Sequence, residues 1–322
     1  MFNWLAGVML PHRVAILGLG LIGGSLLHRL EALGVEVTGY DADPATREAA
    51  VGSRPQASRS NRTTVSGVVD GADLVVLAVP LPAIEDVLSE MRDYTGLLTD
   101  VTSVKAEPRR LAAEHCPGAH WVGGHPMAGR EQSGFAAADA TLFDGCAWVL
   151  TLEEDTDLDA WLTLASLVTM IGARAVPATA DEHDAAVARI SHAPHVLAAA
   201  LAERAGEDPL ALTLGAGSFR DGTRVAATRP ELTAAMCGGN AVAVRTELDA
   251  LIGKLTEARR RLDDPEWFRP AYEIRRAWPP SPGEPHELPA TREALLALGR
   301  AGGWVTAADP ASATVWATSS RV

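Results

Sequence analysis

Cysteine is scarce in this 322-residue chain. The three cysteines, Cys116, Cys146 and Cys237, lie far apart and form no CxxC pair. Disulfide frameworks and zinc ribbons require paired or clustered cysteines. The sequence therefore predicts neither, and we expect a protein of the reducing cytoplasm.

Positive charge and long apolar runs are lacking as well. The chain has 28 basic and 41 acidic residues, a formal net charge of −13. Nucleic acids and anionic membranes attract basic patches, so we expect neither as a partner, although a small anionic substrate needs only local positive charge. No apolar run reaches the roughly 18 residues of a membrane span. The N-terminal MFNWLAGVMLPHR has no basic segment or cleavage site, so we expect no signal peptide.

The first motif present is a glycine-rich turn. RVAILGLG (13–20) has the pattern of a buried strand and LIGGSLLHRLEALG (21–34) that of a helix, with Gly18, Gly20 and Gly23 forming GxGxxG. Such glycines allow a tight turn, close approach of a pyrophosphate and close helix–strand packing, and a helix N-terminus favours the anion. The alternative is a glycine turn in an unrelated α/β protein.

An acidic residue follows at the spacing of a dinucleotide site. VEVTGYD ends at Asp41, 18 residues after Gly23. An acid there bonds the adenosine ribose and repels a 2′-phosphate, which favours NAD over NADP; the nearby Arg47 leaves NADP open. We expect NAD as the cofactor. The residues predicted to bind it are Gly18, Gly20, Leu21, Ile22, Gly23, Asp41, Val79 and Pro80.

Strand and helix patterns alternate through the first half of the chain. The strand candidates after residue 70 are GADLVVLAVP (71–80), GLLTDV (96–101), the region around WVGG (121–124), CAWVLTL (146–152) and ARAVP (173–177). This alternation predicts an α/β fold with one doubly wound, Rossmann-type parallel sheet. Ligands bind beyond the carboxyl ends of such strands, which puts residues 100–105 and 123–130 at the rim of a crevice.

The second half of the chain is helical. We predict a nucleotide domain over residues 1–177, an all-helical substrate and dimerisation domain over 178–277, and a Pro-rich linker with a C-terminal extension of unknown role over 278–322. Within the helical part we expect one helix at 180–205 that Pro194 kinks by removing a backbone bond to residue 190. A glycine-rich bend is expected at 215–226, then one long helix at 231–262, or two broken near Gly238–Gly239.

Polar residues with useful chemistry stand at the predicted rim. TDVTSVK (99–105) supplies Ser103, and GGHPMAGREQSG (123–134) supplies His125 and Glu131. A histidine held in a rigid loop beside a nicotinamide can accept a proton from an alcohol as hydride leaves its carbon. The alternative reading is a structural histidine.

A histidine cluster, DEHDAAVARISHAPH (181–195), raises the question of a metal site. At about 100° per residue, His183 and His192 point to opposite faces of one helix and cannot share a metal. No HExxH motif or cysteine cluster supports a metal, so we predict none. Asp184, Ser191 and His195 share a face. His192 either satisfies the kink at Pro194 or has a function, and His183 receives no role.

Taken together, the motifs resemble a known family. GLGLIGGS, GYD, AVP, TDVTSVK, GGHPMAGREQSG, DEHD with ISHAPH, and GSFRDGTRVA, in this order over residues 13 to about 262, closely resemble the prephenate dehydrogenase family, with arogenate dehydrogenase as its sister activity. The resemblance implies NAD-dependent removal of hydride from a cyclohexadienol with loss of CO2, which gives 4-hydroxyphenylpyruvate in tyrosine biosynthesis.

The resemblance also assigns roles to residues. It implies that His125 accepts the proton of the ring hydroxyl and that Ser103 bonds and orients the same group. Arg224 matches the residue that holds the ring carboxylate, a contact suited to a guanidinium. The alternative for Arg224 is a mutual ion pair with Asp221 that only stabilises a loop.

At the side-chain end of the substrate the resemblance implies His195, with Ser191 nearby. Asp221 would orient the arginine, and Glu131 matches an acid at the pocket mouth. Where many family members have tryptophan, this chain has Thr233. This departure leaves open whether the substrate is prephenate, a keto acid, or arogenate, an amino acid.

Other functions remain to be weighed. A β-hydroxyacid dehydrogenase would need a lysine on the first helix of the helical domain, and residues 180–205 contain none. A non-catalytic dinucleotide sensor would need no Ser/His/Arg set, and a metal-dependent hydrolase conflicts with the opposed histidines. The apolar surface of the 231–262 helix and the helix before it predicts a homodimer formed through the helical domain.

Overall fold

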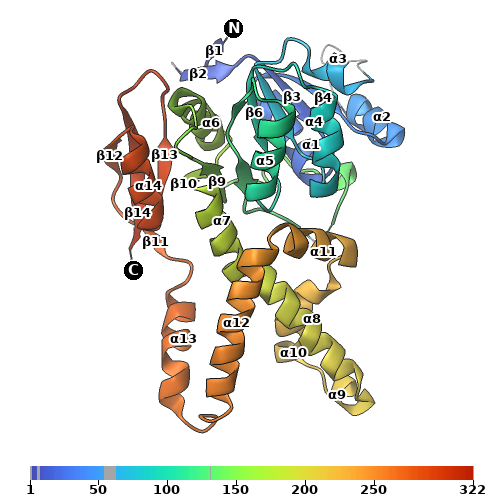
Figure 1. Ribbon diagram of the computed structural model, residues 1–322, viewed down its shortest axis with the longest axis vertical. Helices are drawn as coiled ribbons and strands as arrows, with labels where there is room; N and C mark the ends of the chain where they lie inside the picture. Colours follow the sequence, from blue (N-terminus) through green and yellow to red (C-terminus); the bar gives the residue numbers. More distant parts are fainter. Residues whose placement is uncertain (1, 6–7, 54–62, 131, 322) are drawn as a thin grey trace. The chain divides into compact units, whose positions relative to one another are not determined.

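The computed structural model describes residues 2–5, 8–53, 63–130 and 132–321. The chain divides into two compact units. We call residues 1–183 with 282–321 the sheet unit and residues 184–281 the helical unit. Figure 1 shows the elements of each.

Five parallel strands form the first sheet of the sheet unit, in the order β4-β3-β5-β6-β7. They are β3 (Arg13–Leu17), β4 (Glu36–Tyr40), β5 (Leu74–Leu77), β6 (Leu97–Asp100) and β7 (His120–Trp121). A hairpin of β1 (Phe2–Leu5) and β2 (Val8–Pro11) precedes them. From β3 the chain first adds β4 on one side and then adds β5, β6 and β7 on the other side. This strand order is that of a doubly wound sheet.

Alternate residues of the central strands enter two different cores. Val14 and Ile16 of β3 pack with α1 and α6, whereas Ala15 and Leu17 pack with α4 and α5. Successive strand residues point to opposite faces, so helices must cover both. The helices are α1 (Leu21–Ala32), α2 (Pro44–Gly52), α3 (Val65–Val69), α4 (Ile84–Ser89), α5 (Ala106–His115) and α6 (Leu158–Met170). The predicted α/β fold class is confirmed.

The later strands belong to a second sheet, and here the expectation of one continuous parallel sheet was wrong. β8 (Gly124–Pro126) pairs antiparallel with β9 (Ala147–Thr151), and β9 pairs parallel with β10 (Arg174–Ala178). The chain between β8 and β9 turns back on itself, whereas the α6 crossover keeps β9 and β10 parallel. Strand patterns in the sequence do not carry this direction.

The C-terminal segment completes this second sheet. β13 (Gly303–Ala307) pairs with β10, and β14 (Thr314–Arg321) pairs with β13, β11 (Ser281–Pro282) and β12 (His286–Pro289). α14 (Arg292–Arg300) buries Leu295 and Leu298 and lies against β10 and β13 (Figure 1). The segment set apart in the sequence as an extension is therefore built into the sheet unit.

The helical unit begins inside α7 (Ala180–Val187), which continues as a π-helical turn (Ala188–His192) and α8 (Ala193–Gly206). The turn lies just before Pro194, which lacks the N–H that an α-helix would need there, so the α-helical hydrogen bonding is interrupted at the place where a kink was predicted. The remaining helices are α9 (Pro209–Thr213), α10 (Gly217–Thr223), α11 (Pro230–Gly239), α12 (Ala241–Ala258) and α13 (Pro265–Ala277).

Two details of the helical unit bear on the sequence expectations. The predicted glycine-rich bend was wrong, because residues 217–223 form α10. Of the two alternatives for residues 231–262, one long helix or two helices broken near Gly238–Gly239, the structure shows the second, with the break between α11 and α12. By length and composition alone, the continuous helix Ala180–Gly206 could cross a membrane, although one such helix is weak evidence because helices of soluble proteins pass the same test. Only 28% of its apolar window is buried within the molecule.

Candidate functional site

The turn from β3 to α1 has the geometry of a dinucleotide cradle. Gly18 has φ +98°, where L side chains are strained, and a Cβ on it would collide with the carbonyl of Ala78. A Cβ on Gly23 would meet the Gly18 carbonyl, so both glycines are required by close packing. Gly20 caps α1 with open space beside it. The first turn of α1, which includes Leu21 and Ile22, contains no acid and leaves N–H groups for an anion.

Asp41 follows β4 and closes the same edge. Its Oδ2 accepts a hydrogen bond from the Leu19 backbone N–H at 2.8 Å, and its Oδ1 accepts one from Asp43 at 2.9 Å. Arg47 donates to the carbonyls of Asp41 and Ala42, at 2.6 and 3.1 Å, and lies over the Tyr40 ring. Arg47, whose presence left NADP possible as the cofactor, therefore donates its hydrogen bonds to the protein backbone.

Val79 and Pro80 follow β5 at the carboxyl edge of the same sheet, beside Gly18. A Cβ on Gly18 would also approach the Val79 nitrogen, at 2.9 Å. All eight predicted cofactor residues therefore follow the carboxyl ends of β3, β4 and β5, with Leu21, Ile22 and Gly23 in the first turn of α1. This is the edge at which open α/β sheets bind ligands.

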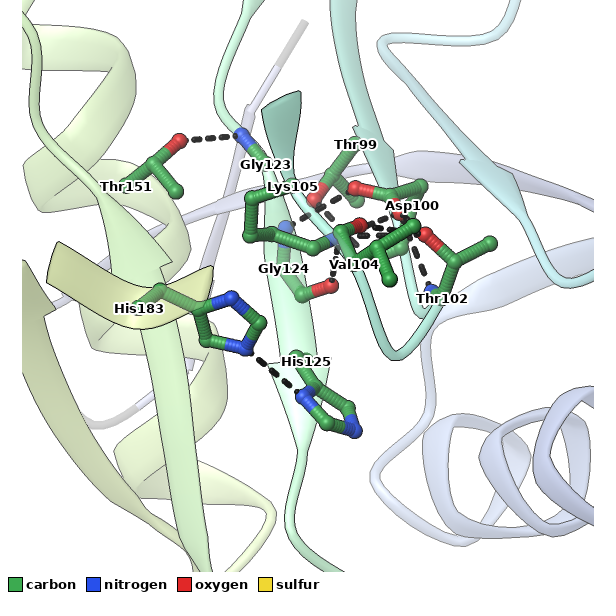
Figure 2. A network of polar contacts seen from close by, with 10 residues as sticks. All are labelled: Thr99, Asp100, Thr102, Val104, Lys105, Gly123, Gly124, His125, Thr151 and His183. Carbon is green, nitrogen blue, oxygen red and sulfur yellow. Dashed lines mark hydrogen bonds and ion pairs between the residues drawn. The ribbon is translucent and has the colours of Figure 1, made fainter. Parts of the chain in front are cut away.

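A buried ion pair follows β6. Lys105 is 1% exposed and Asp100 is fully buried, and Lys105 Nζ is bonded to Asp100 Oδ2. Asp100 also accepts from the backbone N–H groups of Thr102 and Gly124, each at 3.0 Å, while Lys105 Nζ donates to the Gly124 carbonyl at 2.6 Å. Figure 2 shows how these bonds join the loop after β6 to β8. The half-buried Ser103 lies within this loop.

Two glycines let β8 approach this network. A Cβ on Gly124 would lie 2.6 Å from the Asp100 carbonyl oxygen, and one on Gly123 would lie 2.9 Å from Thr151 Oγ1. Gly123 also exchanges hydrogen bonds with Thr151, through its N–H at 2.9 Å and its carbonyl at 2.8 Å. The Gly-Gly-His-Pro segment therefore fixes the backbone of His125 from both sides.

His125 is bonded to a second histidine. Its Nδ1 lies 2.8 Å from Nε2 of His183 on α7, and the two rings meet edge to face (Figure 2). His183 is 2% exposed. Sequence reasoning gave His183 no role, because no spacing rule connects residues that are 58 positions apart.

The predicted substrate residues of the helical unit gather around α8. His195 Nδ1 lies 2.9 Å from the Ser191 carbonyl oxygen, and its Nε2 lies 3.4 Å from Thr228 Oγ1. Ser191 thus contacts His195 through its backbone. His192 is fully buried, and its Nδ1 accepts from Asn240 at 3.2 Å, which ties the π-helical turn to the break between α11 and α12.

The predicted arginine contact is not formed. Asp221 on α10 and Arg224 in the following 3-10 turn are both exposed, and within the described part of the helical unit they make no ion pair. An exposed ion pair gains little free energy, because water stabilises the two separated charged groups almost as well. Thr233 is half-buried on α11. Glu131 lies outside the described residues.

Among the described residues, no group of three or more His, Cys, Asp or Glu side chains could hold a metal ion. A hollow of about 840 Å³ opens beside Asp73, Tyr94, Leu97 and His120. These residues lie at the amino ends of β5, β6 and β7, whereas nucleotide sites form at the carboxyl ends. The hollow is thus separate from the candidate site.

Comparisons with known proteins agree with this geometry. Residues 26–177 match the nucleotide-binding domain of prephenate dehydrogenase, and residues 179–269 match its dimerization domain. The chain belongs to the prephenate dehydrogenase family. The matched spans end before the C-terminal strands, so β11 to β14 and α14 lie outside the part that defines the family.

Individual relatives support the same conclusion. The chain is 32% identical to the Bacillus subtilis prephenate dehydrogenase over 68% of its own length and 62% of that protein. It is 34% identical to a Zymomonas mobilis cyclohexadienyl dehydrogenase over 76% of its length and 87% of that protein. A Corynebacterium glutamicum crystal structure assigned as a prephenate dehydrogenase superposes with a TM-score of 0.75 at 35% identity, covering 84% of this chain and 90% of that one.

Proposed function

We propose that this chain is an NAD-dependent dehydrogenase that converts prephenate to 4-hydroxyphenylpyruvate and CO2. The observation that carries the proposal is the position of His125. In a member of this family, it lies on a strand fixed by two glycines and a buried ion pair, in the sheet unit that also holds the glycine cradle. That support makes it a candidate for proton transfer at a bound ring.

The chain's own residues supply binding and proton handling. The cradle at Gly18 and Gly23 and the free N–H groups of α1 fit a pyrophosphate, and Asp41 fits a ribose. A bound NAD would supply the acceptor for the hydride that leaves the carbinol carbon of the substrate. His125 accepts the proton of the ring hydroxyl, and the ring carboxylate departs as CO2, so that the ring becomes aromatic. Ser103 would hold the same hydroxyl in line.

The helical unit would supply the anion contacts. Arg224 is an exposed guanidinium without a carboxylate partner among the described residues, and it suits the ring carboxylate. His195, with Ser191, would face the side-chain carboxylate, and Glu131 would lie at the pocket mouth. Arogenate is the second candidate substrate, because Thr233 stands where many family members have a tryptophan.

A homodimer and a cytoplasmic location complete the proposal. The family's helical domain is described as a dimerization domain, which supports a dimer through the helical unit. The three cysteines are free thiols, and burial raises the pKa of each, that of Cys146 to about 11. Unreactive thiols without a disulfide suit a reducing compartment.

The test is an NADH assay with prephenate and arogenate, each with NAD and with NADP. We expect turnover with prephenate and NAD. His125→Asn should lower kcat by about 10²–10⁴-fold, the usual contribution of a general base, while NAD affinity stays unchanged. His120→Asn is the matched control, because His120 is half exposed at the amino edge of the sheet.

Three outcomes would count against parts of this proposal. No NADH with either substrate would overturn the function, and turnover with arogenate alone would reassign the substrate. A His125→Asn variant as active as the His120→Asn control would remove His125 from the mechanism.

A further inference from the structure

His125 and His183 form a hydrogen bond whose direction decides what His125 can do. The Nδ1–Nε2 distance of 2.8 Å is that of a hydrogen bond, so one ring donates and the other accepts. Heavy-atom positions are compatible with either direction, because an imidazole has two tautomers.

Only one of the two directions leaves a base. If His183 donated, Nδ1 of neutral His125 would be the acceptor and its proton would lie on Nε2, which could then accept nothing. If His125 donates through Nδ1–H, its Nε2 carries a lone pair. In Figure 2 this nitrogen points away from His183. A proton from a substrate hydroxyl can then be taken up at Nε2, while the Nδ1–H bond to His183 persists in the imidazolium.

We infer that His183 is a positioning residue, which accepts the Nδ1–H of His125 and so holds the catalytic histidine in its proton-accepting tautomer. The inference rests on the proposed function of His125. The role is that of the carboxylate behind the histidine in serine proteases, performed here by a neutral imidazole. A neutral acceptor adds no buried charge to the site.

The fold holds His183 rigidly enough for this role. The first turn of α7 is a capping box, in which the Glu182 N–H donates to Thr179 Oγ1 at 3.2 Å and Glu182 Oε2 accepts from the Thr179 N–H at 2.9 Å. Glu153 accepts from the Ala180 N–H at 2.6 Å, and the N–H of His183 itself donates to the Thr179 carbonyl at 2.9 Å. The ring thus starts from a fixed backbone.

The second sheet contributes to the same support. Arg300 on α14 is paired with Glu182 at 2.6 Å, and Glu153 follows β9. α7 also carries Asp181 and the buried Asp184, and the Lys105–Asp100 pair lies at Gly124 of β8. All of them remain in place in the variants below, so a change in pH dependence reports the histidine bond itself.

The test replaces His183 in the full-length protein by two residues of different hydrogen-bonding capacity. Glutamine can present Oε1 as an acceptor near the position of the imidazole Nε2, and leucine fills similar space with no acceptor. We expect His183→Leu to lower kcat by about 10–100-fold, the size of the effect when a metal-bound histidine loses its hydrogen-bond partner. His183→Gln should retain most of the turnover. KM for NAD should change in neither.

The pH profile separates positioning from simple stability. The Nδ1–H bond stabilises protonated His125, so its loss lowers the pKa of His125, and the acid limb of kcat/KM should move to lower pH in His183→Leu but not in His183→Gln. His115→Leu is the matched control, since His115 is a partly buried histidine at the far end of α5. Equal activity and an unmoved limb in His183→Leu, or equal losses in both variants, would overturn the inference.

A spectroscopic measurement separates this inference from the proposed function. In ¹⁵N-labelled protein without substrate, the ring nitrogens of His125 should show a protonated Nδ1 and an unprotonated Nε2 at neutral pH. The pattern should be lost in His183→Leu. The opposite tautomer in the wild-type protein would overturn the inference, whether or not prephenate is the substrate.

Discussion

At the scale of single residues, removing one partner of the buried pair of Lys105 and Asp100 should lower the stability of the protein. The chain has only two lysines. Lys105 is 1% exposed, and its ammonium group is bonded to Asp100 and to the Gly124 carbonyl. Removing one partner of a buried pair leaves an uncompensated charge, which typically costs about 3–5 kcal/mol. Lys105→Met keeps the apolar stem but strands the Asp100 carboxylate. We expect a loss of that size in the free energy of unfolding, measured by urea titration.

The second lysine provides the control. Lys254 on α12 is 73% exposed, and its pair with Glu257 at 3.6 Å is a surface contact. Such pairs are worth at most about 1 kcal/mol, so Lys254→Met should leave the urea midpoint almost unchanged. If both substitutions had the same small effect, the Lys105 pair would not hold the loop after β6 to β8.

At the scale of elements, α14 packs unusually close to β10. A Cβ on Gly299 would collide with the carbonyl of Pro177. Gly299→Ala therefore forces α14 away from the sheet, and overpacking of this kind costs about 1–3 kcal/mol. Thermal unfolding should show a lower Tm. Gly52→Ala is the matched control, because Gly52 ends α2 with open space around its Cα and alanine favours a helix. A Tm as high as that of the control would exclude tight packing at Gly299.

The elements also show what the sequence could predict. Local rules were sufficient for the β3–α1 turn and for the irregular helical turn before Pro194, because each depends on neighbouring residues. The antiparallel direction of β8 and the union of β13 with β10 depend on pairing between distant segments, and no local pattern encodes it.

In the candidate site, too, local motifs predicted some residues, whereas contacts between distant residues were not predicted. His125 and Ser103 stand in short motifs, from which they were predicted as site residues. The bond between His125 and His183 joins a strand to a helix 58 residues away, and the capping box at Thr179 predicts where that helix begins but not what it touches. A contact between residues so far apart in the sequence can be identified only once the fold is known.

At the scale of the whole molecule, exposed apolar side chains are concentrated in one unit. Among residues 11–53, 63–130 and 132–320, whose side-chain burial the structure describes, Trp316 is the one exposed large hydrophobic residue of the sheet unit. The helical unit holds Ile190, Leu201, Leu210, Leu212, Leu214, Leu232, Val242, Ile252, Leu255, Leu262, Phe268, Tyr272, Ile274 and Trp278. Soluble proteins rarely leave so much apolar surface open to water unless a partner covers it. A second copy of the chain, bound through this unit, would cover it.

The proposed dimer predicts that an introduced charge has different effects in the two units. Ile252 on α12 is 60% exposed, and a glutamate there would be buried without a partner in a dimer, at a cost of several kcal/mol. Each 1.4 kcal/mol weakens association about tenfold, so Ile252→Glu should shift micromolar protein from dimer to monomer in sedimentation velocity. Trp316→Glu changes an equally apolar exposed residue of the sheet unit and should remain dimeric. A monomeric wild-type protein, or a dimer that tolerates Ile252→Glu but dissociates with Trp316→Glu, would move the interface away from the helical unit.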